Sequence, residues 1–391
     1  MSLSFRELAV AGSRGTAVLA ASCLTVLPVF AMAQQQLGLD VEMTTFYASN
    51  PFLLPGDEGA AGWELAAKSD AVWLIGPRTS LQSEGAVGFR QYSQRYGNFV
   101  TGRGAGILQH RYSEYLSVRA EAYHERVLPT EALADSIDSA IDPLSIRRNS
   151  YLSSALTWNP DARTSVTGAV AWTRIDPSQS SILKDTTAIE YTVGVERRVD
   201  PFFSLGVKGQ FTSSRSAFGD SSLKAFRLTA SRRLGGRWQA NANLGIDQET
   251  TTLRGSPIDS SPVRLSGEVS ICQQPERMQM CLTAAMRSVV SGLGTVERES
   301  SAGVSVTRQT SEQGSLSASA SYVRGPIGQI AGPTEDEKAS ALRLSATYYH
   351  QVSRRSSLQA GLRYLRRVQA GGDAIDSMVV QAGIVFKERR R

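Results

Sequence analysis

Two cysteines are the first residues whose type and spacing suggest chemistry. Cys272 and Cys281 flank the turn-like segment QQPERMQM, so they stand at the ends of two neighbouring chain segments. Thiols placed in this way form a disulfide in an oxidising compartment. A metal site is the alternative, but structural zinc needs four ligands and no histidine lies nearby in the sequence. We therefore predict a Cys272–Cys281 disulfide and no metal site.

The histidines belong to no known catalytic motif. The sequence has three, His110, His124 and His350, and it contains neither G-x-S-x-G nor H-E-x-x-H. The glycine-rich segment 102–106 has no helix after it, so it is not a phosphate-binding loop. Serine and aspartate are frequent, and a His–Ser or His–Asp pair stays open. We predict no enzyme activity and no cofactor, with an enzyme acting on lipid or sugar as the alternative.

A set of charged residues stands opposite apolar neighbours in alternating segments. Its members are Arg90, Arg119, Glu121, Glu190, Glu196, Lys208, Arg227, Arg343 and Arg363. Alternate side chains of a β-strand point to opposite faces, so these charges share the polar faces of their strands. Two interpretations stay open: the charges pair with one another, or they line a hydrated path that attracts an acidic solute.

Apolar residues repeat with a period of two along nearly the whole chain after residue 37, as expected for β-strands. In residues 238–247, WQANANLGID, the apolar side chains share one face and the amides share the other. No apolar run of 18 residues follows residue 33, which excludes a helical membrane protein. The pattern predicts an all-β fold with about 18 strands, or 16 if the two least regular segments are not strands.

The predicted strands are joined alternately by short turns and by longer connections. They are residues 37–48, 65–76, 80–93, 97–110, 113–127, 149–158, 162–174, 185–198, 201–213, 220–234, 237–249, 261–272, 279–289, 299–309, 313–324, 337–350, 354–368 and 375–388. Two connections, near 94–96 and 214–219, are short where longer ones are expected. This arrangement is typical of a transmembrane antiparallel outer-membrane β-barrel. A β-sandwich would need a larger Val/Ile/Leu core, and a β-helix would show a short repeat.

Residues 1–33 have the pattern of a secretion signal. Arg6 and Arg14 precede an apolar stretch, and Ala31-Met32-Ala33 matches a cleavage site. An anchored N-terminal helix is the alternative. Export removes contact with cytoplasmic nucleic acid, so the net charge of +6 is not interpreted as nucleic-acid binding. We expect residues 34–391 to form one barrel domain, surrounded by lipid in the outer membrane of a Gram-negative cell.

Aromatic residues and one long loop add detail to the expected barrel. Interfacial aromatic girdles are predicted from Trp73, Trp158, Trp172, Trp238, Tyr364 and Phe386, which fall near strand ends. The longest connection, residues 128–148, is acidic in its middle. We expect it to fold inward as a constriction or a plug.

Four segments resemble the β-barrel porins found in bacterial exopolysaccharide loci, of the beta-barrel porin 2 type. They are FYASNPF (46–52), CLTAAMRSVVSGLG (281–294), ESSAGVSV (299–306) and GSLSASASYVR (314–324). Ala48 and Ser49 stand where that family often has acidic residues before Asn-Pro. The resemblance implies an outer-membrane barrel that works with a periplasmic or outer-membrane polysaccharide export protein on a polysaccharide chain.

These observations lead to one preferred function and three alternatives. The preferred one is a channel that takes part in exopolysaccharide export across the outer membrane. A general diffusion porin for small solutes is the second. A barrel enzyme and a plugged structural or adhesive barrel are the others. The sequence leaves the solute and the oligomeric state open.

Overall fold

The computed structural model describes residues 34–93, 96–131, 133, 142, 145–178, 180, 182–253, 259–260, 262–273, 277–290, 296–326, 338–368 and 372–390. Residues 1–33, interpreted above as a secretion signal, lie outside this part of the chain, and that interpretation stays a prediction. None of the described residues belongs to a helix long and apolar enough to cross a membrane.

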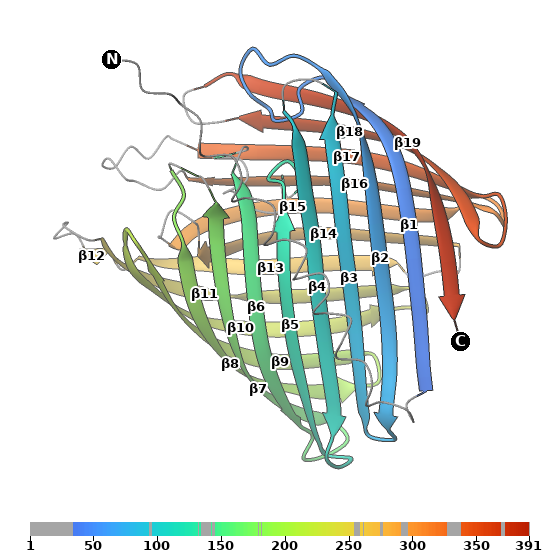
Figure 1. Ribbon diagram of the computed structural model, residues 1–391. Coiled ribbons are helices and arrows are strands. Elements are labelled where there is room, and N and C mark those ends of the chain that lie inside the picture. The colour runs from blue at the N-terminus through green and yellow to red at the C-terminus, as the bar shows by residue number, and fades with distance from the viewer. Residues whose placement is uncertain are drawn as a thin grey trace, which may run out of the picture.

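The described chain forms a closed antiparallel β-barrel with 18 strands in its wall (Figure 1). The strands are β1 (Gln34–Ala48), β2 (Ala60–Gly76), β3 (Thr79–Tyr92), β4 (Asn98–Arg111), β5 (Leu116–Val127), β6 (Ile146–Trp158), β7 (Thr164–Ser178), β8 (Thr186–Asp200), β9 (Phe203–Ser216), β10 (Gly219–Leu234), β11 (Trp238–Leu253), β12 (Asp259–Ser260), β13 (Val263–Gln273), β14 (Met278–Val290), β15 (Val296–Gln309), β16 (Gly314–Pro326), β17 (Lys338–Gln351), β18 (Ser356–Val368) and β19 (Ala374–Arg390). The short strand β12 only extends the end of β11. Pairing of β1 with β19 closes the wall, so neither of these two strands is left as an unpaired edge.

The prediction of an all-β barrel with 18 strands is confirmed, and the alternative of 16 strands is wrong. The largest boundary difference is in β2, predicted from residue 65 but beginning at Ala60. Residues 60–64 pair with the upper part of β1, and this long-range pairing extends the strand beyond the segment with clear alternation.

Short turns and long connections lie at opposite ends of the barrel. Residues 77–78, 201–202 and 235–237 join strands at the end where β1 starts and β19 stops, which faces the lower right of Figure 1. At the other end β5 stops at Val127 and β6 begins at Ile146, and β16 stops at Pro326 and β17 begins at Lys338, so the longer connections start and finish there. In outer-membrane barrels the short turns are periplasmic and the longer loops are extracellular. We use these two names for the ends below.

The outer surface of the wall is apolar and exposed. In β8, Tyr191 and Val193 are 51% and 61% exposed, whereas the alternate residues Glu190 and Thr192 face inward. Four of the six predicted girdle aromatics, Trp73, Trp158, Trp238 and Phe386, lie towards the periplasmic end. Trp172 and Tyr364 lie nearer the extracellular end. An apolar outer band above a row of aromatics is the surface that a lipid bilayer covers.

The assignment of inner and outer faces has a direct test in β8. Val193→Arg places a charge on lipid and is expected to destabilise the barrel by about 2–4 kcal/mol. Thr192→Arg, one residue away, faces the lumen and is expected to cost much less. Unfolding by denaturant in lipid vesicles measures both. Equal losses would contradict the assignment.

Two apolar clusters of described residues lie inside the extracellular half of the barrel. Leu53 and Leu133, both fully buried, pack against inward-facing Val323, Ala341 and neighbouring residues. A second cluster places Phe52 and Leu128 against Tyr92. Thus loop 49–59 and the described start of loop 128–148 fold into the barrel. The inward fold of loop 128–148 agrees with the prediction. Loop 49–59 also folds inward, which the sequence analysis does not predict.

Candidate functional site in the barrel lumen

An arginine clasp holds the inward-folded loop 128–131 to the wall. Arg90 of β3 contacts Glu64 of β2 at 2.6 Å and Glu131 of the loop at 2.5 Å. Arg343 of β17, on a distant part of the wall, donates a hydrogen bond to the main-chain oxygen of Glu131. Because Glu131 is bonded from both sides, the loop crosses part of the lumen rather than resting on one strand. We call these four residues the clasp.

Loop 49–59 is fastened beside the clasp by its own hydrogen bonds. The side chain of Asn50 accepts a bond from the Leu54 amide at 3.0 Å and donates one to the Leu54 oxygen at 2.8 Å, which closes a turn. Arg367 of β18 donates to the Leu53 oxygen at 3.2 Å. Phe46, in the strand before the loop, lies 5.4 Å from the Arg90 guanidinium, within range of a cation–π contact. The two loops together narrow the extracellular half of the lumen.

Arg363 is the one arginine near the clasp that has no partner among the described residues. It lies on the inner face of β18, directly opposite Ser345 of β17. Arg90 and Arg343 are both engaged by Glu131, so Arg363 carries the uncompensated charge of this group. A free guanidinium on the lumen wall attracts anions that pass it.

The described ends of β14 and β15, a short way along the wall from β17, also enter the lumen. The β13–β14 ladder stops at Gly267–Met286, and the β15–β16 ladder starts at Ser300–Arg324. Residues 287–290 and 296–299 therefore pair only with each other, and β15 contacts β10 and β11. Ser288 donates a hydrogen bond to Glu249, and its amide lies 3.4 Å from Asp247. We call residues 287–290 and 296–299 the flap.

Asp247 organises the charges beneath the flap. Its carboxylate is fully buried and accepts hydrogen bonds from Arg227 at 3.1 Å and from Ser266 at 2.7 Å. Arg227 also donates to Gln210 at 3.0 Å, and Gln210 donates to Glu190 at 3.1 Å. Buried charges need such complete pairing because an unpaired one is expensive. The network makes this part of the wall rigid.

The remaining predicted residues lie around a cavity lower in the lumen. A space of about 420 Å³ is lined by Arg119, Glu190, Glu196 and Lys208, among others. Arg119 contacts Glu121 on its own strand at 3.2 Å. The register therefore places all nine predicted residues on inner strand faces. One group lies at the clasp, and the other lies around Asp247 and this cavity. Whether they contact a solute stays a prediction.

Sequence reasoning missed four acidic partners in these groups: Glu42, Glu64, Glu131 and Asp247. Glu42 pairs with Lys68 at 3.0 Å and accepts a bond from Gln359 on the strand after next. Glu42, Glu64 and Asp247 lie on the polar faces of their strands. The alternation of apolar and polar residues that identified the inward-facing arginines therefore also identifies these three acids. Glu131 lies in a loop, where no parity rule holds.

One part of the lumen wall, below Arg343 and Arg363, has mainly hydroxyl side chains. The inward-facing residues of this hydroxyl wall, on β15, β16 and β17, are Ser301, Ser305, Thr307, Ser317, Ser319, Ser321, Ser345 and Thr347. Ser319 and Ser345 lie 2.8 Å apart across two strands. Short hydroxyl side chains leave space for solute and offer both donors and acceptors.

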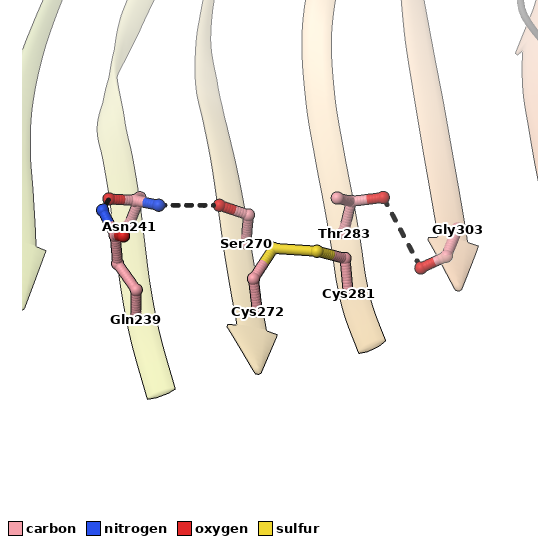
Figure 2. Close-up of a disulfide and its surroundings, with 7 residues drawn as sticks. All are labelled: Gln239, Asn241, Ser270, Cys272, Cys281, Thr283 and Gly303. Atoms are coloured by element: carbon pink, nitrogen blue, oxygen red, sulfur yellow. Dashed lines mark hydrogen bonds between the residues drawn. A yellow bond between two sulfur atoms is a disulfide. The ribbon is translucent and has the colours of Figure 1, made fainter. Parts of the chain in front are cut away.

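The predicted disulfide is present at the periplasmic end. Cys272 and Cys281 are directly opposite on β13 and β14, with Cα atoms 4.1 Å apart (Figure 2). Two hydrogen bonds beside it join these strands to their outer neighbours: Asn241 of β11 donates to Ser270 of β13, and Thr283 of β14 donates to the Gly303 oxygen of β15. The β13–β14 ladder is shorter than the other ladders between wall strands, so the covalent bond reinforces the weakest join.

Removal of the disulfide is expected to destabilise the barrel without preventing closure. Changing both cysteines to serine should lower the free energy of unfolding by about 2–3 kcal/mol, the loop-entropy value for so short a loop. Denaturant unfolding of the variant, compared with wild type with and without reductant, measures this. Unchanged stability in both would show that hydrogen bonding alone holds the join.

The histidines form no catalytic group among the described residues. His110 contacts Thr79 at 2.8 Å, and His124 contacts Ser150 at 2.9 Å on the outer face. His350 stacks beside Tyr348. The described residues also contain no group of three or more His, Cys, Asp or Glu placed to hold a metal.

Comparison with known proteins supports the fold. No family model and no curated protein matches the sequence. Among solved structures, Pseudomonas aeruginosa OccK9 (OpdG) has a TM-score of 0.51 and 12% identity, over 91% of this chain and 99% of that one. The chain has the fold of an outer-membrane porin. The porin-like barrel is also similar to P. aeruginosa OccK2 (OpdF), with a TM-score of 0.49 and 13% identity over 90% and 98% of the chains. A BenF-like porin from Pseudomonas fluorescens Pf-5 gives 0.48 and 12% over 91% and 98%.

Sequence identities this low support a conclusion about the fold and about nothing further. The resemblance to exopolysaccharide-locus porins predicted a porin-like barrel, which is the observed fold. The association with polysaccharide export stays a prediction.

Proposed function

We propose that this barrel is a carbohydrate channel of the Gram-negative outer membrane that takes part in exopolysaccharide export. The hydroxyl wall is the observation that carries the proposal. Its serines and threonines offer many weak hydrogen bonds, which let a polyhydroxylated chain slide without binding tightly. Its charged neighbours Arg343 and Arg363 border it towards the extracellular end, so most of its length offers a polymer hydroxyl groups.

The export role needs a partner in the periplasm. The sequence resemblance supports a polysaccharide export protein that delivers the chain to the periplasmic end. In this proposal the clasp and the flap keep the lumen narrow at rest, and polymer displaces them. The barrel provides the path and performs no chemistry on the polymer.

A diffusion porin for small solutes is the second candidate. The narrowing by loops 49–59 and 128–131 and by the flap favours it, since a small solute passes a constriction that no polymer could pass unaltered. In this case no periplasmic partner is needed. The lumen charges would then select among small ions and sugars.

A deletion strain and the purified barrel together separate the candidates. The export role predicts that deletion stops secretion and leaves polymer in the periplasm, and that the purified barrel conducts ions in planar bilayers. Normal secretion with steady conductance would reject export and leave a diffusion porin. Absence of conductance with normal secretion would reject both and leave a plugged barrel or an enzyme.

A further inference from the structure

Two arginines face each other on the outer surface of the barrel. Arg126 of β5 and Arg148 of β6 are directly opposite in the register, on the outward faces of their strands. Like charges in this position destabilise a sheet. Arg148 has only Asp176, at 3.7 Å. The Arg126 side chain has no partner in the described part of the chain, and its Nε is buried. An anion that bridged the two guanidinium groups would relieve this repulsion.

The height of the pair places it at a membrane surface. Trp158, 50% exposed, ends β6 at the periplasmic side. With about 3.3 Å per residue and a strand tilt of about 40°, the stretch from Arg148 to Trp158 spans about 25 Å, the height of the apolar band. The arginine pair therefore lies at the extracellular interface, where the headgroups of the outer leaflet lie.

A flat strip runs from the arginine pair down into the apolar band. It consists of the outward-facing glycines Gly102, Gly104 and Gly106 of β4 and, opposite them, Arg126, His124 and Ala122 of β5. A Cβ added at Gly104 or Gly106 would meet nothing within 4 Å, so the surface there is open. His124 and Ser150 satisfy each other at 2.9 Å. The β4 side of the strip carries no side chains, so an extended acyl chain can lie along its three glycines.

We propose that the arginine pair and the glycine strip form a binding site for a phosphorylated glycolipid of the outer leaflet, of the lipid A type. One phosphate bridges Arg126 and Arg148, because guanidinium groups bind phosphate oxygens in pairs. One acyl chain lies along the glycines. A soluble phosphate would use only the first half of this site. The site is independent of what passes through the lumen.

Thermal unfolding of the purified full-length barrel in neutral detergent tests the site. Titration with bisphosphorylated lipid A is expected to raise Tm progressively, since a ligand of the folded state stabilises it. Lipid A stripped of phosphate and inorganic phosphate should each act only at far higher concentration. Arg126→Gln with Arg148→Gln should weaken lipid A binding by at least about tenfold, the effect of losing a charged hydrogen bond. Gly104→Leu should weaken it while both arginines remain.

The matched control is Arg215→Gln. Arg215 is also an outward-facing arginine near the extracellular rim, but Asp220 lies 3.4 Å from it. Its replacement should leave lipid A binding unchanged. The proposal is overturned if wild type gains no stability from lipid A, if the double arginine variant binds as tightly as wild type, or if inorganic phosphate binds as tightly as lipid A.

Discussion

Arg90→Met is expected to lower the free energy of unfolding by about 3–4 kcal/mol, the lower part of the range for a broken buried ion pair. The Arg90 side chain is only 13% exposed, whereas Glu64 and Glu131 keep 25% and 28% exposure. The change leaves two carboxylates close together in the lumen without their shared cation. Because Glu131 then loses its tie to β3, loop 128–131 should leave the lumen and single-channel conductance should rise.

A double-mutant cycle separates pairing from packing in the clasp. Denaturant unfolding of Arg90→Met, Glu131→Gln and the double variant gives the coupling energy. The double variant should be more stable than the sum of the single losses predicts. Arg366→Met, a half-exposed arginine on the outer face 3.8 Å from Asp376, is the control and should cost little. Additive losses with unchanged conductance would mean that the clasp neither holds the loop nor narrows the lumen.

Arg363→Gln is expected to shift the channel towards cations. A unit charge 5–7 Å from a permeating ion in water contributes about 0.6–0.8 kcal/mol, of opposite sign for anions and cations, so its removal should change the anion-to-cation permeability ratio about tenfold. Arg363→Glu should produce about the square of that change. Reversal potentials across a salt gradient in planar bilayers measure the ratio.

The control for Arg363 lies three residues away on the same strand. Arg366→Gln removes the same charge from the outer face, where no permeating ion passes, and should leave the ratio unchanged. The shift should also shrink at high salt, since screening shortens the reach of a charge. Equal effects of the two replacements would show that Arg363 does not face the conducting path.

Much of the barrel follows from local pattern. Alternation with period two depends only on neighbouring residues, so the 18 strands and the parity of residues such as Glu190 and Arg227 could be predicted. The Cys272–Cys281 disulfide could also be predicted, because a short turn brings the two strands into register. Alternation fades near the rims, where a strand passes beyond the lipid, and there the boundaries were less accurate.

Contacts across the lumen could not be predicted in this way. Arg90 and Arg343 meet at Glu131 because closure of the wall brings β3 and β17 round to one loop. The flap is also a tertiary feature, because Ser288 reaches past β13 to Asp247 and Glu249 of β11. The apolar run Phe52-Leu53-Leu54 in a predicted loop was a usable signal, since three such side chains rarely stay exposed.

The sequence by itself determined the all-β architecture with a choice between 18 and 16 strands, the faces that meet lipid and lumen, and the disulfide. Each of these rests on residues that are close in the chain or on alternate sides of one strand. The tertiary structure alone decided which charges pair, which arginine stays free, and which loops enter the lumen. These depend on the curvature of a closed wall, which places residues hundreds of positions apart within hydrogen-bonding distance.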